Sequence, residues 1–171
     1  MEDSISSILI LVLLIIMSAY FSATETAYSS LNKIKLKSIA NKGNKKAKLA
    51  LELSEKYDSV ISTILIGNNI VNIATASLAT VLFTKLLGSS GVTVSTIVMT
   101  ILILIFGEIS PKSIAKDIPE SFAIVSAPLL NAFCIILKPV NNLFCLWKKV
   151  ISKVFKIQKH SGITEDEILT I

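Results

Sequence analysis

The chain has 171 residues, of which 52% are hydrophobic and 17% charged, and its mean hydropathy is +0.70. Soluble domains carry about 25% charged residues, so this balance indicates an integral membrane protein with one membrane domain. The net charge of +5 arises from 17 lysines without any arginine, and aromatic residues make up only 6%. Long apolar runs and few aromatic residues exclude a nucleic-acid-binding protein, and the lysines are better interpreted as topology signals.

The first apolar run, Ile5–Phe21, predicts a membrane-spanning helix that is retained in the protein. Glu2 and Asp3 precede this run, whereas a cleaved signal peptide would carry positive charge there. We therefore expect the N-terminus outside. The next segment, Lys33–Asp58, contains eight lysines and is expected in the cytoplasm. Gly43 followed by Asn44 indicates a helix stop and a new N-cap, which predicts two short helices in this segment.

The second apolar run, Val60–Leu87, has 28 positions, which correspond to ~42 Å of helix, more than a ~30 Å hydrocarbon core requires. This helix must therefore tilt, bend or protrude. Gly88–Gly91 predicts a tight turn outside, and Val92–Phe106 returns to the cytoplasm. The predicted spans are thus about residues 5–25, 60–87 and 92–110.

The fourth apolar run, Phe122–Leu137, has only 16 residues and contains Pro128. A fourth crossing would place five later lysines, from Lys148 to Lys159, outside the cell, contrary to the positive-inside rule. We therefore predict a juxtamembrane helix over about residues 121–151, along the inner surface, in preference to a fourth span. Residues 1–159 would form the membrane domain, and residues 160–171 the start of a polar, acidic linker.

The hexapeptide Gly107–Lys112 ends the third run and contains a candidate ion site. A carboxylate at the edge of a membrane segment is costly, so Glu108 is a functional candidate. Pro111 has no N–H, so in a helix the carbonyl of Gly107 would lose its usual partner. Together with the Ser110 hydroxyl, these groups are hard oxygen ligands of the kind that Mg²⁺, Ca²⁺ or Na⁺ accepts.

Polar groups on the other two spans are expected at similar depths. Asn68 and Asn72 are four residues apart and share one face of the second helix, with Asn69 beside it. Counting ~1.5 Å per residue from the outer end places Ser22 at ~26 Å and Glu108 at ~24 Å. Asn68 lies ~12 Å from the inner face, and hence ~18 Å from the outer face of a ~30 Å core. The alternative for the asparagines is interhelical hydrogen bonding without any ion, and the matching depths favour an ion site.

Glu25 is a second carboxylate near this depth, and the sequence leaves two interpretations open for it. Ser22 and Glu25 are three residues apart and share a helical face, so Glu25 could belong to the ion site. It could equally be an interfacial charge near Lys33 or Lys112. The Ser22 hydroxyl has a similar alternative, because serine in a helix often donates to its own backbone.

Three motifs in order, FSATETA at 21–27, GNNIVN at 67–72 and GEISPK at 107–112, resemble the transmembrane domain of the CorC and cyclin M (CNNM) magnesium transporters. The resemblance covers about residues 5–159. It implies a homodimer with three transmembrane helices per subunit and a juxtamembrane belt. It also implies Mg²⁺ export coupled to Na⁺ influx, and cytoplasmic CBS modules that bind ATP and would follow residue 171.

The resemblance also implies a ligand set for a largely dehydrated Mg²⁺. The direct ligands would be Ser22, Asn68, Asn72, the Gly107 carbonyl and Glu108. Thr63 matches a position where relatives place a polar ligand. The supporting residues would be Glu25, Asn69, Ser110, Pro111 and Lys112.

The resulting hypothesis is a Na⁺-coupled secondary transporter that exports Mg²⁺ across the inner (plasma) membrane, with the C-terminus in the cytoplasm. The alternative is a dimeric membrane scaffold that senses Mg²⁺ without moving it. An enzyme is not expected, because the sequence shows no HExxH, GxSxG or P-loop motif.

Overall fold

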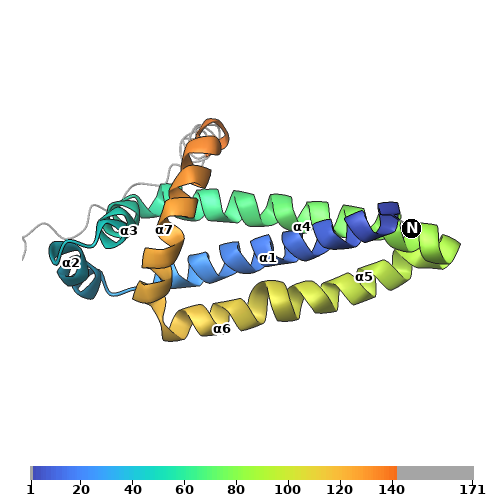
Figure 1. Cartoon of the computed structure of the whole chain (residues 1–171), viewed down its shortest axis with the longest axis horizontal. Coiled ribbons are helices and arrows are strands. Elements are labelled where there is room, and N and C mark those ends of the chain that lie inside the picture. Colours follow the sequence, from blue (N-terminus) through green and yellow to red (C-terminus); the bar gives the residue numbers. More distant parts are fainter. Residues whose placement is uncertain (1, 142–171) are drawn as a thin grey trace, which may run out of the picture. The chain divides into compact units, whose positions relative to one another are not determined.

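The computed structural model describes residues 2–141, and every element in that range is helical, which confirms the predicted all-α fold. Of the described residues, 2–138 belong to one compact unit, shown in Figure 1, and the last three, 139–141, are assigned to a separate unit. The elements of the first unit are α1 (Glu2–Ser30), α2 (Lys33–Asn41), α3 (Lys45–Glu55), α4 (Tyr57–Leu87), the short η1 (Gly88–Ser90), α5 (Gly91–Leu102), the π-helix η2 (Ile103–Ile109), α6 (Ser110–Asp117) and α7 (Pro119–Ile136).

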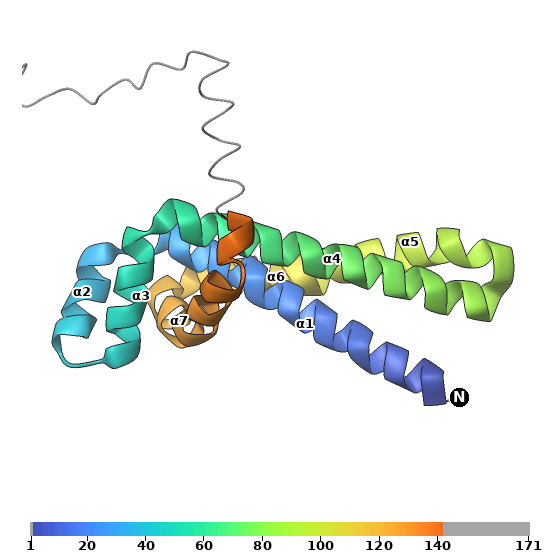
Figure 2. The same cartoon turned by 90° about the horizontal axis from the view of Figure 1, so that it is seen from above.

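Three helical stretches within the described residues are long and apolar enough to cross a membrane, namely 5–30, 57–117 and 119–136. The second has 61 residues, or ~92 Å of helix, about three times the thickness of a hydrocarbon core. It reverses at η1, after which α4 and α5 lie side by side (Figures 1 and 2). The predicted turn after the second run is confirmed, and this stretch supplies two antiparallel helices.

Helix α7 has a different direction from the other long helices. It runs steeply across α1 and α4 in both views (Figures 1 and 2), although its length and composition would also allow it to cross a membrane. Its place along the inner surface stays a prediction. The helix ends at Ile136, with Leu137 as its C-cap. The predicted helix over 121–151 is therefore interrupted at Leu137, and residues 142–151 lie outside the described residues.

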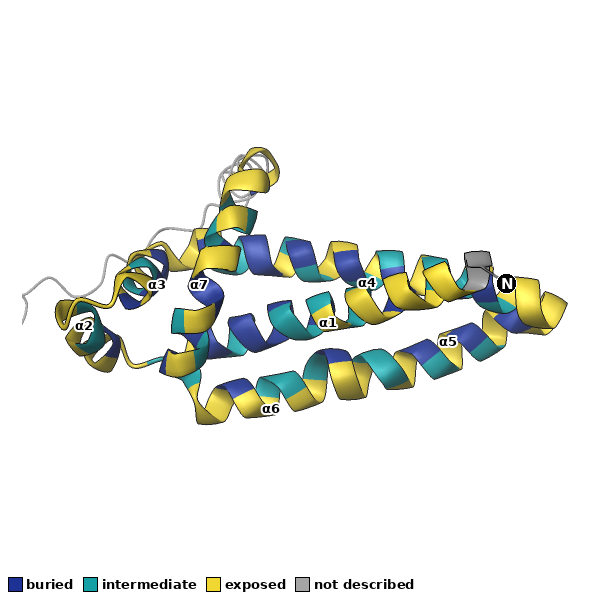
Figure 3. Cartoon of the chain, in the orientation of Figure 1, coloured by how far each residue is buried: buried dark blue, intermediate teal, exposed yellow. Residues whose placement is uncertain are grey.

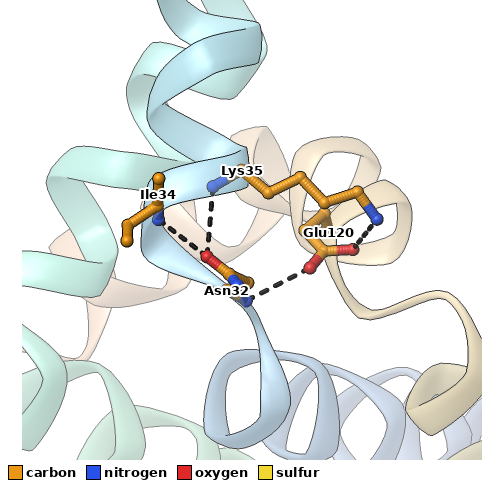
Figure 4. Close-up of polar contacts among 4 residues, drawn as sticks. All are labelled: Asn32, Ile34, Lys35 and Glu120. Carbon is orange, nitrogen blue, oxygen red and sulfur yellow. Dashed lines mark hydrogen bonds and ion pairs between the residues drawn. The ribbon is translucent and has the colours of Figure 1, made fainter.

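The lysine-rich segment Lys33–Asp58 forms the two short helices that the sequence predicts. The Asn32 side chain caps α2 by accepting from the N–H groups of Ile34 and Lys35, and Asn44 caps α3. Figure 4 shows how Glu120, in the first turn of α7, contacts the start of α2. Its carboxylate accepts from the Asn32 N–H at 3.2 Å and from Lys35 Nζ at 2.9 Å. The carboxylate thus joins the end of α1 to the start of α7.

Helix α1 is the centre of the packing, with α4 on one side and η2 and α6 on the other. Its buried positions gather in the half nearer α2, whereas the other half is largely exposed (Figure 3). A lipid-facing surface explains these exposed apolar side chains. At the buried end the Phe21 ring lies 4.9 Å from the Phe133 ring of α7, and Tyr20 Oη donates to the Ser126 carbonyl at 2.9 Å.

Gly67 is where α4 comes closest to the Phe21 ring. A Cβ built on Gly67 would lie 2.5 Å from that ring, so the position leaves no room for a side chain. We expect Gly67→Ala to lower the free energy of unfolding by about 1–3 kcal/mol, because the methyl group overpacks this contact. Thermal unfolding in detergent micelles would measure the loss. The control is Ala76→Val at an exposed position of α4; equal losses in both variants would contradict this role of Gly67.

Candidate functional site

Ser18 of α1 brings the two predicted asparagines together. Its fully buried hydroxyl lies 2.7 Å from Asn72 Oδ1 and 3.2 Å from Asn68 Oδ1. A serine hydroxyl carries one proton, so it can donate fully to only one of these amide oxygens at a time. Three oxygens therefore converge around one proton. Such an excess of acceptors is the arrangement that a bound cation would satisfy.

Gly107 of η2 meets the same hydroxyl from the other side of α1. A Cβ built on Gly107 would lie 3.0 Å from Ser18 Oγ, tighter than nearly all real Cβ contacts. The absence of a side chain at Gly107 therefore permits η2 to approach α1 here. Through Ser18, the structure brings together Asn68 and Asn72 of α4 and Gly107 of η2, which lies 35 residues or more from either asparagine in the sequence.

The segment that carries Gly107 and Glu108 is a π-helix, which the sequence analysis did not predict. The Ser110 N–H donates to the Ile105 carbonyl five residues back, and Pro111 follows directly. Proline cannot donate to Gly107, and a wider turn at this point is one way in which a helix absorbs such a break. Single π-turns within α-helices are frequent at functional sites.

Ser22 lies one turn after Ser18 on α1 and is fully buried. Within the described part of the chain its Oγ has no hydrogen-bond partner. A buried hydroxyl without a partner is destabilising by roughly 1–3 kcal/mol and is rare in native proteins. The expected alternative, a bond from Ser22 to its own helix, is therefore not made. A role in binding a ligand is the simplest physical reason for a buried hydroxyl that has no partner in the protein.

Glu108 is half-buried beside Gly107 and, among the described residues, makes no hydrogen bond or ion pair. The structure does not join it directly to the asparagines. The same region contains no cluster of three or more His, Cys, Asp or Glu side chains. The candidate site thus consists of neutral oxygens with one nearby carboxylate.

The supporting residues have various surroundings. Glu25 pairs with Lys112 Nζ at 3.3 Å, which selects the ion-pair interpretation for Glu25 in this structure. Asn69 is exposed and donates to the Leu65 carbonyl of its own helix. Thr63 is buried and donates to the Ser59 carbonyl at 2.9 Å. Ser110 is exposed, and Pro111 is partly buried.

Sequence reasoning missed Ser18, because it lies inside the first apolar run. A usable signal was nevertheless present. Ser18 and Ser22 are four residues apart on one helix face, the same spacing as Asn68 and Asn72. Two polar pairs with matching periodicity on neighbouring membrane helices predict that those faces meet.

The helices and these enclosed oxygens define a multi-pass, all-α membrane protein with a polar site between its helices. The chain belongs to the cyclin M (CNNM) family, because the family model described as "Cyclin M transmembrane N-terminal domain" matches residues 9–171. The resemblance seen in the three sequence motifs is therefore confirmed.

Individual relatives agree with this membership. The chain is 42% identical over 124 residues to a UPF0053 protein of Haemophilus influenzae, covering 72% of this chain and 30% of the relative. It is 44% identical over 113 residues to the UPF0053 inner membrane protein YfjD of Escherichia coli, covering 66% and 26%. It is 31% identical over 138 residues to the polyamine export protein of H. influenzae, covering 73% and 32%. The chain thus spans less than a third of the length of each of these relatives.

The Ser18 contacts can be tested by their effect on stability. We expect Ser18→Ala to lower the free energy of unfolding by about 1–2 kcal/mol, because it leaves the Asn72 amide oxygen without its donor. The matched control is Ser62→Ala on α4, whose hydroxyl bonds only to its own helix and whose loss should cost less than about 0.5 kcal/mol. Unfolding in micelles compares the two, and indistinguishable losses would contradict a bridging role for Ser18.

Proposed function

We propose that this chain is the ion-conducting membrane domain of a transporter that exports Mg²⁺ in exchange for Na⁺. The observation that supports the proposal most is the convergence of Ser18, Asn68 and Asn72 oxygens around a single proton, next to the open hydroxyl of Ser22. The direct ligands would be Ser22, Asn68, Asn72, the Gly107 carbonyl and Glu108. Ser18 would contribute its oxygen or hold the amides in position.

The chemistry of these proposed ligands suits a cation that must be released as well as bound. Mg²⁺ takes about six oxygens in an octahedral shell and gives up water reluctantly. One carboxylate offsets part of its charge, and neutral amide, hydroxyl and carbonyl oxygens supply geometry without a deep electrostatic trap. A cluster of several carboxylates would hold the ion more tightly and slow its release.

The arrangement of the helices suggests how the site would change sides. Helix α1 lies between α4 and η2, so a shift of α1 or η2 would separate Ser22 from the groups on the opposite helix. The π-turn at η2 gives that element a second hydrogen-bond register to move into. A Na⁺ gradient would drive the cycle, in keeping with the resemblance to Na⁺-coupled relatives.

The proposed setting is the inner (plasma) membrane, with the N-terminus outside and the C-terminus in the cytoplasm. The inner membrane location follows the name of the E. coli relative. Helix α7, steeply inclined to the spanning helices (Figure 2), would form the juxtamembrane belt. The active unit would be a homodimer joined through its membrane helices, and ATP would act through CBS modules outside these 171 residues.

Two other functions compete with this proposal. A Mg²⁺-sensing membrane scaffold would bind the ion at the same residues without moving it. Polyamine export is suggested by the name of one relative, and the ammonium of Lys112 on Glu25 gives an example of an amine held near the site. Small converging oxygens fit a compact metal ion better than an extended polyamine.

Transport measurements separate these functions. In proteoliposomes containing a Mg²⁺-sensitive dye, we expect Na⁺-dependent Mg²⁺ flux that falls at least about tenfold in Glu108→Ala, since the site would lose its only carboxylate ligand. Glu52→Ala, an exposed carboxylate on α3, is the control and should transport like the parent.

The remaining outcomes decide among the alternatives. Unchanged flux in Glu108→Ala would overturn the proposed site. Mg²⁺ binding without any flux would favour the scaffold, and uptake of labelled spermidine that is insensitive to Mg²⁺ would favour polyamine export.

A further inference from the structure

The Glu25–Lys112 ion pair lies at one end of the candidate site. Glu25 comes three residues after Ser22 on α1, and Lys112 comes four residues after Glu108, at the start of α6. Glu25 and Lys112 therefore both lie nearer to α2 and α7 than Ser22 and Glu108 do. The predicted topology places this end of the helices at the cytoplasm. The pair joins the two helices at 3.3 Å, with side-chain exposures of 28% for Glu25 and 42% for Lys112.

Helix geometry relates Lys112 to both carboxylates of this region. Its ammonium contacts Glu25 on the neighbouring helix, and Lys112 lies about one turn from Glu108 on its own helix. Helix α1 packs against both η2 and α6, so the groups belong to one packed interface. The ion pair therefore lies on the same helices as the Ser22 and Glu108 oxygens, about one turn nearer this end.

We propose that Lys112 is a built-in competitor for the transported cation at Glu25. While the pair is closed, the two charges cancel and only Glu108 attracts a cation. When a divalent cation displaces the ammonium, the carboxylate of Glu25 becomes available, and the two carboxylates together match the charge of the ion. This inference rests on the proposed function and adds a means by which that site favours divalent over monovalent cations.

The properties of the pair suit a contact that opens repeatedly. Partly exposed ion pairs contribute little net stability, so the exchange of one cation for another at Glu25 has a low cost. The other carboxylate that joins α1 to this side of the bundle, Glu120, is more enclosed, with 9% side-chain exposure and two donors. Glu120 is thus suited to hold the helices together while Glu25 exchanges its partner.

Calorimetric titration of the full chain with MgCl₂ in micelles, at low ionic strength, tests the proposal. We expect Lys112→Gln to tighten Mg²⁺ binding about three- to tenfold, because it frees a carboxylate near the site. In the Glu25→Gln background the same change should tighten binding less than about twofold, because no carboxylate remains to be freed. Lys116→Gln, an exposed lysine one turn further along α6, controls for the loss of one positive charge.

Each result supports or overturns the competition. Equal tightening by Lys112→Gln with and without Glu25 would show a general field effect and overturn it, as would equal effects of Lys112→Gln and Lys116→Gln. The charge-reversed double variant, Glu25→Lys with Lys112→Glu, provides a second test if the single variants unfold. It should bind Mg²⁺ more tightly than Glu25→Lys alone, and equal or weaker binding would overturn the proposal.

Glu108→Ala separates this inference from the proposed function. Mg²⁺ binding that depends on Glu108 but not on the Glu25–Lys112 pair would overturn the competition alone. Binding that is absent in the parent, or that is unaffected by Glu108→Ala, would overturn the proposed ion site and the competition with it.

Discussion

The close approach of α1 to two other helices is the constraint on which the candidate site depends. Phe21 of α1 fills the space over Gly67, and Ser18 lies against Gly107. A lipid interior offers no water to satisfy polar groups, so side chains brought together at such a distance must satisfy one another or a ligand. The oxygens of Ser18, Asn68 and Asn72 satisfy one another only in part. Helix packing thus creates a polar site in an otherwise apolar bundle.

The two ends of α1 are held in different ways. At the end near α2, Glu25 pairs with Lys112, and Glu120 binds the backbone just after α1. Toward the other end, Leu11 packs against Ala79, Leu82 and Met99, and several large apolar side chains of α1 are exposed. Of the two carboxylates near α2, the more enclosed Glu120 is better placed to hold this end of the helix, whereas the partly exposed Glu25–Lys112 pair contributes little net stability.

Membership of the cyclin M family gives this packing a context, although the chain spans less than a third of the relatives described above. The polar site lies wholly within residues 18–108, and hence within the matched region. Helix α7 contacts α1, α3 and α4, so a domain attached after it could act on the site helices through α7.

The sequence by itself determined the helical class, the turn at Gly88–Gly91, the break at Gly43–Asn44 between α2 and α3, and the family, because hydropathy, capping residues and motif order are local properties. It also identified Ser22, Asn68, Asn72, Gly107 and Glu108 as candidates from their polarity in apolar surroundings. Only the tertiary structure showed that Ser18 contacts both asparagines and that a π-turn precedes Pro111. It also showed that Glu25 pairs with Lys112 and not with Lys33, the other partner that the sequence allowed. Each of these depends on the rotation and separation of neighbouring helices, which residue spacing along one helix does not specify.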